Sequence, residues 1–331
     1  MPFKIILHDI TTMNTDAIVN AANSSLKEGG GVCGAVFRRA GSHELQEACD
    51  RIGSCPTGSA VITPGFHLHA KYIIHAVGPI YKDGRHQEKE QLRSCYESSL
   101  ELAAAHHLSS IAFPLISAGI YGYPKDQALA AATEAIRSFL DSHEMEVYLC
   151  LFRKEDLQLD SALQASLQDC LSSPDRTESQ FRMRFGASQL SEDISCSIQG
   201  PADTALSGSS RDLSELLRYR NETFTEMLLR LIDEKGLEDV TVYKRANLDR
   251  KLFSKIRSAR DGYQPSKATV LALAVGMSLS LEETEDLLAV AGYALSPAYP
   301  RDVIVRYFLE SGHPDIMTVN QALFAFGEET L

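Results

Sequence analysis

DAIVNAANSSLKEGGGVCGAVFRRAG, spanning residues 16–41, sets the architecture that we expect for the first half of the chain. An apolar run ends at Asn20, a polar turn follows, and three consecutive glycines at 29–31 precede an apparent helix over 32–40. Glycines let the backbone approach a ligand closely and turn its N–H groups outward. At a helix N-terminus such amides favour an anion, whereas an ordinary strand-to-helix turn does not need three glycines. The pattern predicts a phosphate-binding loop.

A second glycine-rich stretch, FPLISAGIYGYPKDQAL at 113–129, repeats this arrangement. An apolar strand is followed by Ser117, Gly119 and Gly122, and then by Pro124 at a position suited to open a helix. Two such loops at the carboxyl ends of strands in one sheet can face each other across a crevice, so we expect a diphosphate between them. Neither loop reads GxxxxGK[ST] or GxGxxG, which disfavours nucleoside triphosphates and ordinary Rossmann dinucleotide binding.

Strand-like and helix-like segments alternate around these loops up to residue 171. Several of the strand-like runs are continuously apolar, as strands buried on both faces are. They lie at 3–7, 17–20, 60–63, 72–76, 111–114 and 147–151. Helical spacing of apolar residues appears at 88–106, 125–140 and 160–171. The alternation predicts an α/β sandwich with helices on both faces of the sheet.

Four motifs in a fixed order give a more specific indication. VNAANSSL, GGGV, AVGP at 76–79 and ISAGIYGYP together resemble the macro domain family, and in particular its MacroD-like branch of ADP-ribose binders and hydrolases. The resemblance covers roughly residues 3–171. It implies a three-layer α/β/α sandwich with a mixed central sheet over 1–171, and ADP-ribose or an ADP-ribosylated protein as the partner.

The resemblance also implies a set of ligand contacts. Asp9 would accept a hydrogen bond from the adenine amino group, the backbone of Ile10 would help to hold the base, and Phe152 would lie near its ring. Asn23, next to Ala22, would contact the hydroxyls of the distal ribose. The diphosphate would be held by main-chain amides of Gly30, Gly31, Val32, Ser117, Ala118, Gly119, Ile120 and Tyr121, and Tyr121 would also pack on the distal ribose. The alternatives are a helix or turn cap for Asp9 and core packing for Phe152.

The candidate catalytic residues are Asn23 and Cys33. MacroD-like hydrolases usually carry an aspartate directly after GGGV, which is thought to orient or deprotonate the attacking water, and this chain has Cys33 there. A thiol with an ordinary pKa near ~8.5 is mostly neutral at pH 7 and is a poor general base. Some viral macro domains resemble this chain in having cysteine there and are still regarded as hydrolases, with the ligand's own diphosphate assisting the water. A nucleophilic Cys33, activated by the helix N-terminus, is a third option.

The second half of the chain has a different character. Ten of the forty-one residues at 172–212 are serine, which predicts a linker or a loose connection, although alternating Phe181, Met183 and Phe185 could dock on a domain. After 212 the strand patterns disappear. An apolar stripe at helical spacing starts at Leu213, and glycine or proline breaks follow at 236, 262–265, 292, 297–300 and 312–314. We expect an all-helical domain over 213–331.

A basic segment within this domain suggests a nucleic-acid partner. Residues 240–270 contain eight basic and two acidic residues, a local net charge of +6 in a chain of net charge -12. The stretch 248–295 resembles the helix-turn-helix of the phage-repressor-like (XRE) family, which places such a module around 240–295. The resemblance implies that DNA contacts Arg250, Lys251, Ser254, Lys255 and Arg257. Against it, 239–247 is not the glutamine-led helix typical of that family, and a basic helix is usually only a solvated face or a surface for an acidic partner.

Composition limits the remaining possibilities. The chain of 331 residues is 44% hydrophobic and 23% charged, which fits a globular protein of two domains. We find no apolar run of the ~18 residues that a membrane span needs and no secretory signal, and expect a cytoplasmic protein without a membrane partner. Seven scattered cysteines, without CxxC pairs or zinc spacing, predict reduced thiols and neither metal nor other cofactor.

Two functions therefore stand at this point. One is an enzyme that removes ADP-ribose from modified proteins or deacetylates O-acetyl-ADP-ribose, with water attacking at the distal ribose or its ester. The other is a non-catalytic ADP-ribose reader, coupled to a helical module that binds DNA or protein.

Overall fold

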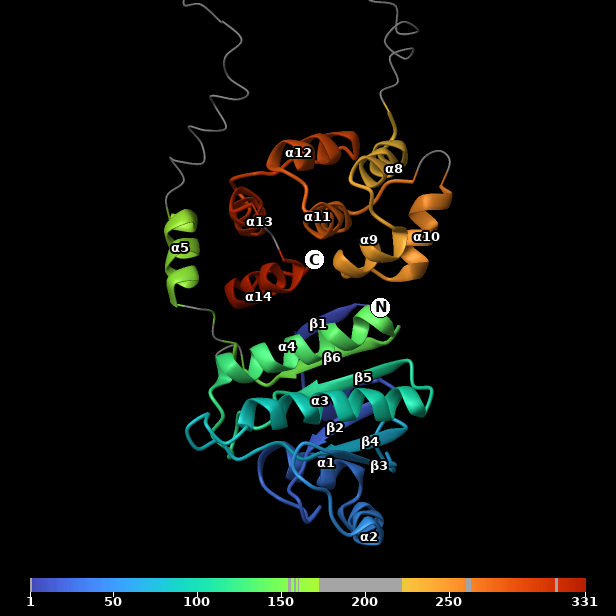
Figure 1. The fold of residues 1–331 in the computed structure, drawn as a ribbon, viewed down its shortest axis with the longest axis vertical. Coiled ribbons are helices and arrows are strands. Elements are labelled where there is room, and N and C mark those ends of the chain that lie inside the picture. Colours follow the sequence, from blue (N-terminus) through green and yellow to red (C-terminus); the bar gives the residue numbers. More distant parts are fainter. Residues whose placement is uncertain are drawn as a thin grey trace, which may run out of the picture.

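The computed structural model describes residues 2–153, 156, 157, 159, 161–172, 222–259, 263–312 and 315–331 (Figure 1). The expected serine-rich linker, apart from its first residue, and the docking segment around Phe181 lie outside the described residues. Among the residues that are described, no helix combines the length and the apolarity that a membrane span needs.

A six-stranded mixed sheet forms the centre of the first half. Its strands are β1 (Phe3–Leu7), β2 (Ala17–Ala21), β3 (Ala60–Pro64), β4 (Tyr72–Ala76), β5 (Ser110–Pro114) and β6 (Glu146–Leu151). They lie in the order β1-β6-β5-β2-β4-β3, and all neighbours are parallel except β3 and β4. The carboxyl ends of β1, β6, β5, β2 and β4 therefore share one edge of the sheet, and the loops after β2 and β5 are neighbours there.

Helices cover both faces of this sheet. Helices α1 (Gly31–Ala40) and α2 (Ser42–Ile52) enclose one core with Ile18 and Phe37, while α3 (Glu88–Ala105) and α4 (Lys125–Ser142) enclose another with Val19 and Tyr96. Ile18 and Val19 are adjacent on β2 and point to opposite faces, as successive strand residues must. All four side chains are at most 1% exposed. The predicted three-layer sandwich is confirmed.

The described residues after 222 form helices and no strand, in agreement with the expected all-helical region. The helices are α8 (Phe224–Glu234), α9 (Asp239–Arg245), α10 (Arg250–Ser258), α11 (Lys267–Gly276), α12 (Leu281–Val290), α13 (Pro300–Glu310) and α14 (Ile316–Phe326). Helix α11 is buried from Thr269 to Gly276, and the other helices surround it (Figure 1). Helix α5 (Ser161–Ser172) follows the last strand but lies against α13.

The helical half sits on strand β1, with α9 and α14 lying over β1 and α4 (Figure 1). β1 is an edge strand, and such strands present unpaired N–H and C=O groups. Here the side chain of Asn247 accepts from the N–H of Phe3 at 2.7 Å and donates to its carbonyl at 2.9 Å. Nearby, the hydroxyl of Tyr243 donates to Glu144 at 3.1 Å. The two halves thus share one continuous apolar core and a polar seam.

A candidate ligand-binding cleft

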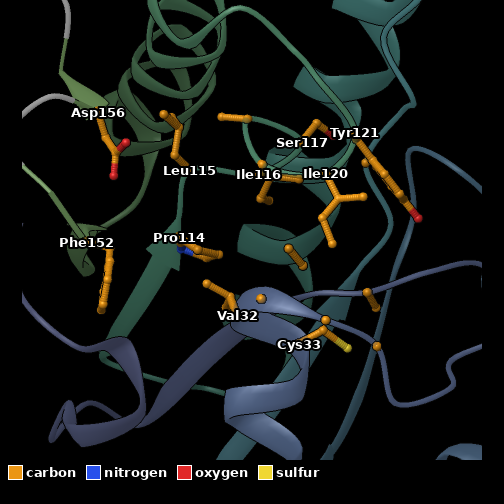
Figure 2. A pocket seen from close by; sticks show the side chains of 18 of the residues that line it. Val32, Cys33, Pro114, Leu115, Ile116, Ser117, Ile120, Tyr121, Phe152 and Asp156 are labelled. Atoms are coloured by element: carbon orange, nitrogen blue, oxygen red, sulfur yellow. The ribbon is translucent and has the colours of Figure 1, made fainter.

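A cavity of about 340 Å³ opens at the edge of the sheet where the parallel strands end (Figure 2). It lies between the two glycine loops and the segment after β6. Every predicted ligand or catalytic residue of the first half lines it except Asp9 and Ile10; those that do are Ala22, Asn23, Gly30, Gly31, Val32, Cys33, Ser117, Ala118, Gly119, Ile120, Tyr121 and Phe152. The two loops face each other, as their positions after adjacent strands require.

The first glycine loop ends on the N-terminus of α1. Gly30 is the N-cap residue and has no side chain that could occupy the first amides of the helix. Gly31 opens the helix with a φ of +61°, a conformation that a residue with a side chain adopts at a cost. Unpaired amides and the helix dipole both favour a negative charge at this point. The N-terminus of α1, which lines the cavity, is therefore suited to an anion.

The second glycine loop turns on Ser117. This residue has a φ of +64°, and its carbonyl accepts the N–H of Tyr123 at 3.0 Å to close the loop. Its side chain is 6% exposed, and its hydroxyl finds no hydrogen-bond partner among the described residues. A Cβ placed on Gly78 of the AVGP motif would lie 2.2 Å from this hydroxyl oxygen. Gly78 therefore has to be a glycine for the loop to take this position.

Ile120 connects the two loops at the mouth of the cavity. A Cβ built on Gly30 would lie 3.3 Å from the Cδ1 atom of Ile120, although the isoleucine side chain is 81% exposed. The N–H of Tyr81 donates to the carbonyl of Tyr121 at 2.9 Å and holds this part of the second loop in place. An extended ligand between the loops would lie beneath Ile120.

Asn23 is largely occupied by its own turn. Its Oδ1 accepts the hydroxyl of Ser25 at 2.8 Å and the N–H of Lys27 at 3.1 Å, and its Nδ2 donates to the carbonyl of Lys27 at 2.8 Å. An amide nitrogen carries two N–H groups, so one donor remains for a ligand. The side chain is held in one orientation and offers one N–H at the end of the cavity.

Cys33 lies in the first turn of α1, and burial raises the pKa of its thiol, an effect that outweighs the opposing hydrogen bonds from Asn20 and Gly29. The sulfur accepts from Nδ2 of Asn20 at 3.7 Å and donates to the carbonyl of Lys27 at 3.9 Å. Burial therefore opposes activation of this thiol by the helix N-terminus, because it favours the neutral form over the thiolate. The sequence analysis also missed His75, which reaches the cysteine only through Asn20, 3.1 Å from its ring.

The opposite end of the cavity is formed by the end of β6 and the segment after it, next to β1, which pairs with β6 in parallel. Phe152 follows β6, is 74% exposed, and lines the cavity, so the core-packing alternative does not describe it. Asp9 follows β1; neither it nor the buried Ile10 is among the residues that line the cavity, and their expected contact with adenine stays a prediction. Asp9 caps the short helix η1 (Ile10–Thr12), with its Oδ1 accepting from the N–H and hydroxyl of Thr11 at 2.9 and 2.8 Å. The structure therefore shows a turn cap at Asp9, and a cap does not exclude a contact with a ligand.

Comparison with known proteins agrees with this architecture. A family model described as "Macro domain" matches residues 19–132. "Macro domain-containing protein CT2219" of Chlorobaculum tepidum is 50% identical over 165 residues, which cover 48% of this chain and 95% of that protein. The chain belongs to the macro domain family. An "O-acetyl-ADP-ribose deacetylase" of Salmonella typhimurium is 47% identical over 162 residues, 47% of this chain and 90% of that protein. The Oceanobacillus iheyensis macrodomain solved with ADP has 44% identity and a TM-score of 0.45, and the match covers 46% of this chain and 84% of that one.

Several lining residues of the macro domain were not predicted from the sequence. Apolar wall residues come from the ends of β5 and β6, and charged ones come from the start of α4 and the segment after β6. They are Pro114, Leu115, Ile116, Cys150, Leu151, Lys125 and Asp156. Only Lys125 had a local signal, because it follows the helix-opening Pro124. Asp156 pairs with it at 2.7 Å, a contact between residues far apart in the sequence.

A cluster of three titratable residues lies outside the cleft, before and at the start of α3. Ligand atoms of Asp83, His86 and Glu88 lie within 4.8 Å of one another. The carboxylate of Glu88 is 2% exposed and accepts main-chain N–H groups of the 82–86 loop, including that of His86 at 2.5 Å. Burial alone would raise the pKa of Glu88, but its own main-chain N–H and those of His86, Lys82 and Asp83 lower it to about 2. We assign the cluster to loop structure.

Helix α10 carries the basic residues that were predicted to bind nucleic acid. Phe253 and Ile256 of this helix are buried, whereas Lys251, Ser254 and Lys255 are exposed. Whether α9 and α10 work as a helix-turn-helix stays a prediction, because the similarities above cover less than half of the chain and lie in the macro domain.

Two of the α10 cations already have carboxylate partners. Arg250 lies with its Nη1 3.6 Å from Oε1 of Glu144 in the macro domain, and Arg257 pairs with Asp239 at the start of α9. The ammonium of Lys255 lies 5.5 Å from the ring centroid of Tyr263. Lys251 and Lys255 are exposed on α10 and are the residues at which the predicted nucleic-acid contact is best tested.

Proposed function

We propose that the macro domain binds ADP-ribose in the cleft and hydrolyses it from modified proteins, or deacetylates O-acetyl-ADP-ribose. The observation that carries the proposal is the pair of glycine loops that enclose one cavity, with the N-terminus of α1 at its floor. Main-chain amides at a helix N-terminus suit a diphosphate. The deacetylase name of relatives 47–48% identical to this chain supports the same substrate class.

The ligand's orientation follows from the two ends of the cavity. Figure 2 shows Phe152 and Asp156 at one end and Cys33 and Tyr121 at the other. The exposed ring of Phe152 suits stacking on adenine. The diphosphate then lies between the loops, and the distal ribose reaches Asn23 and Tyr121.

The chemistry needs a water directed at the distal ribose. The free N–H of Asn23 orients the sugar, and the loop amides and the α1 dipole stabilise negative charge on the diphosphate. Water attacks the anomeric carbon or the ester carbonyl, and ADP-ribose leaves together with the protein side chain or acetate. Because Cys33 stays neutral and cannot act as a base, the ligand's diphosphate takes that part. General-base help is worth roughly 10²–10⁴ in rate, so turnover is slow.

Turnover assays with the full chain test the proposal. The purified protein should bind ADP-ribose in calorimetry and release product from O-acetyl-ADP-ribose or from an ADP-ribosylated protein. Asn23→Ala should lower kcat more than affinity, because it removes an orienting group and not the anion site. If calorimetry detects no binding of ADP-ribose, the proposed site is rejected.

The second candidate is a non-catalytic reader, and the neutral thiol at the position of the expected base is the observation that favours it. Tight ADP-ribose binding without product in either assay would establish this candidate. The exposed cations of α10 would then give the reader a surface for DNA or for an acidic protein.

A further inference from the structure

An ion pair marks the end of the cavity at which we place the adenosine. The Nζ atom of Lys125, at the start of α4, lies 2.7 Å from Oδ1 of Asp156. Both residues line the cavity, and their side chains are 36% and 23% exposed. Figure 2 shows Asp156 and Phe152 together at this end, away from Cys33. A ligand whose base lies on Phe152 would bring its nearer ribose to this carboxylate.

The carboxylate of Asp156 is held in place. Its Oδ2 accepts the N–H of Arg153 at 3.1 Å, and its own N–H donates to the carbonyl of Arg153 at 3.1 Å. With the bond from Lys125, each oxygen has one donor. An ionised carboxylate offers about four lone-pair sites, so acceptors remain for sugar hydroxyls.

A carboxylate at this position discriminates between two kinds of adenosine ribose. It accepts hydrogen bonds from a free 2′-hydroxyl, as acidic side chains do in NAD sites, whereas a 2′-phosphate usually needs a cation. A phosphate set against a carboxylate suffers like-charge repulsion and loses the hydroxyl donor. Lys125 acts in the opposite direction, because its charge partly neutralises Asp156 and would attract a phosphate.

Building on the proposed function, we propose that Asp156 is a specificity-determining residue that selects ADP-ribose with a free 2′-hydroxyl on its adenosine ribose and rejects ADP-ribose 2′-phosphate. Lys125 sets the strength of this selection. The class of substrate is thereby restricted to ADP-ribose that derives from NAD and not from NADP.

Calorimetry of the full chain with ADP-ribose and with ADP-ribose 2′-phosphate tests the selection. Wild-type protein should prefer ADP-ribose by about tenfold or more. Asp156→Asn, which keeps the shape and an acceptor oxygen, should reduce this preference to within about threefold. Lys125→Met should widen it, because Asp156 then carries an unopposed charge.

The opposite signs separate selection from a structural role. An ion pair that only holds α4 to the segment after β6 would make both variants weaken both ligands by the same factor, and unchanged ratios would overturn the inference. Equal affinities of the wild type for the two ligands would overturn it too, while leaving the proposed function intact. Failure to bind ADP-ribose at all would reject the proposed function itself. Melting temperatures show whether each variant folds. If a variant does not fold, the ratio of the wild-type affinities for the two ligands still tests the inference.

Discussion

The side-chain amide of Asn247 makes with the main chain of Phe3 the two hydrogen bonds that a neighbouring strand would make, at 2.7 and 2.9 Å. Asn247 is 6% exposed and has a φ of +55°, a left-handed conformation in which asparagine is among the few tolerated residues with a side chain. Side chain and backbone conformation together fit this residue to the edge of the sheet. One residue of the helical half therefore completes the sheet of the other half.

Replacing Asn247 should destabilise the whole protein. Asn247→Ala leaves a buried N–H and C=O of Phe3 unpaired, at about 1–3 kcal/mol each, and adds left-handed strain of about 1–2 kcal/mol. Asn247→Gly is the matched control, because it removes the amide without the strain. Urea unfolding should rank wild type above the glycine variant and the glycine above the alanine variant. A glycine variant as stable as the wild type would show that the two bonds contribute nothing.

Cys33→Asp should raise turnover. A carboxylate there would be held by the donors that now hold the sulfur, Asn20 and Gly29, and would supply the missing base. We expect kcat to rise by about tenfold or more, since general-base catalysis typically contributes about 10²–10⁴ in rate. Cys33→Ser is the control, since a neutral hydroxyl should give no gain. If both variants turn over at the wild-type rate, the cysteine is not what limits the reaction.

Gly78→Ala should disrupt the second glycine loop. Its Cβ would lie 2.2 Å from the Ser117 hydroxyl and 2.6 Å from Cγ2 of Ile116, so the loop has to move. Overpacking of this kind costs about 1–3 kcal/mol, and ADP-ribose affinity in calorimetry should fall by about tenfold or more. A Cβ on Gly119, in the same loop, meets nothing within 4 Å of protein, so Gly119→Ala should leave the free energy of unfolding unchanged. Similar losses in the two variants would contradict a specific contact with Ser117.

Acid should destabilise the protein through His75. Burial lowers the pKa of this histidine from 6.5 to about 4, so the unfolded chain takes up a proton between these values that the folded chain refuses. Stability is therefore lost as the pH falls, by about 2 kcal/mol between pH 7 and pH 5. Urea unfolding of His75→Gln should show a flatter profile over this range, which lies above most of the titration of Glu88. A slope unchanged by the substitution would assign the effect to other groups.

The exposed face of α10 should determine any binding of DNA. Lys251→Glu with Lys255→Glu changes two exposed cations that are not bonded to the macro domain, and it should weaken a low-salt gel shift and lower the salt slope by about 2. Glu144→Gln is a control that releases Arg250 without altering those two lysines. Absence of a shift at any salt concentration would remove DNA from the proposed partners.

The glycine loops and the layers of the macro domain were predictable because their signals are local. Glycine triplets, apolar runs and a helix-opening proline act through a few neighbouring residues. Helix α2 had no such signal, since only Leu45, Ala48 and Cys49 of its eleven residues are buried. Its first residue follows Gly41, whose φ of +103° lets one helix lead directly into the next.

The polar contacts of the site were beyond the reach of sequence patterns. The Lys125–Asp156 pair and the link from Cys33 through Asn20 to His75 join residues on different elements, and only the fold brings them together. Family resemblance predicts that Asp9 contacts the ligand, and the contact with Thr11, by which Asp9 caps η1, could not be read from that resemblance. Resemblance indicated where the cleft lies, and the structure shows which side chains line it.

Helix α5 packs on α13, and its Leu167 is fully buried. A fragment that ends after residue 171 would therefore expose the buried side of α5, leave the N–H and C=O of Phe3 without Asn247, and uncover the surface of β1 on which α14 packs. Such a fragment would tend to aggregate. If it failed to bind ADP-ribose, that result would not show that the cleft of the full chain cannot bind it. Biochemistry on this protein is best done with both halves in one polypeptide.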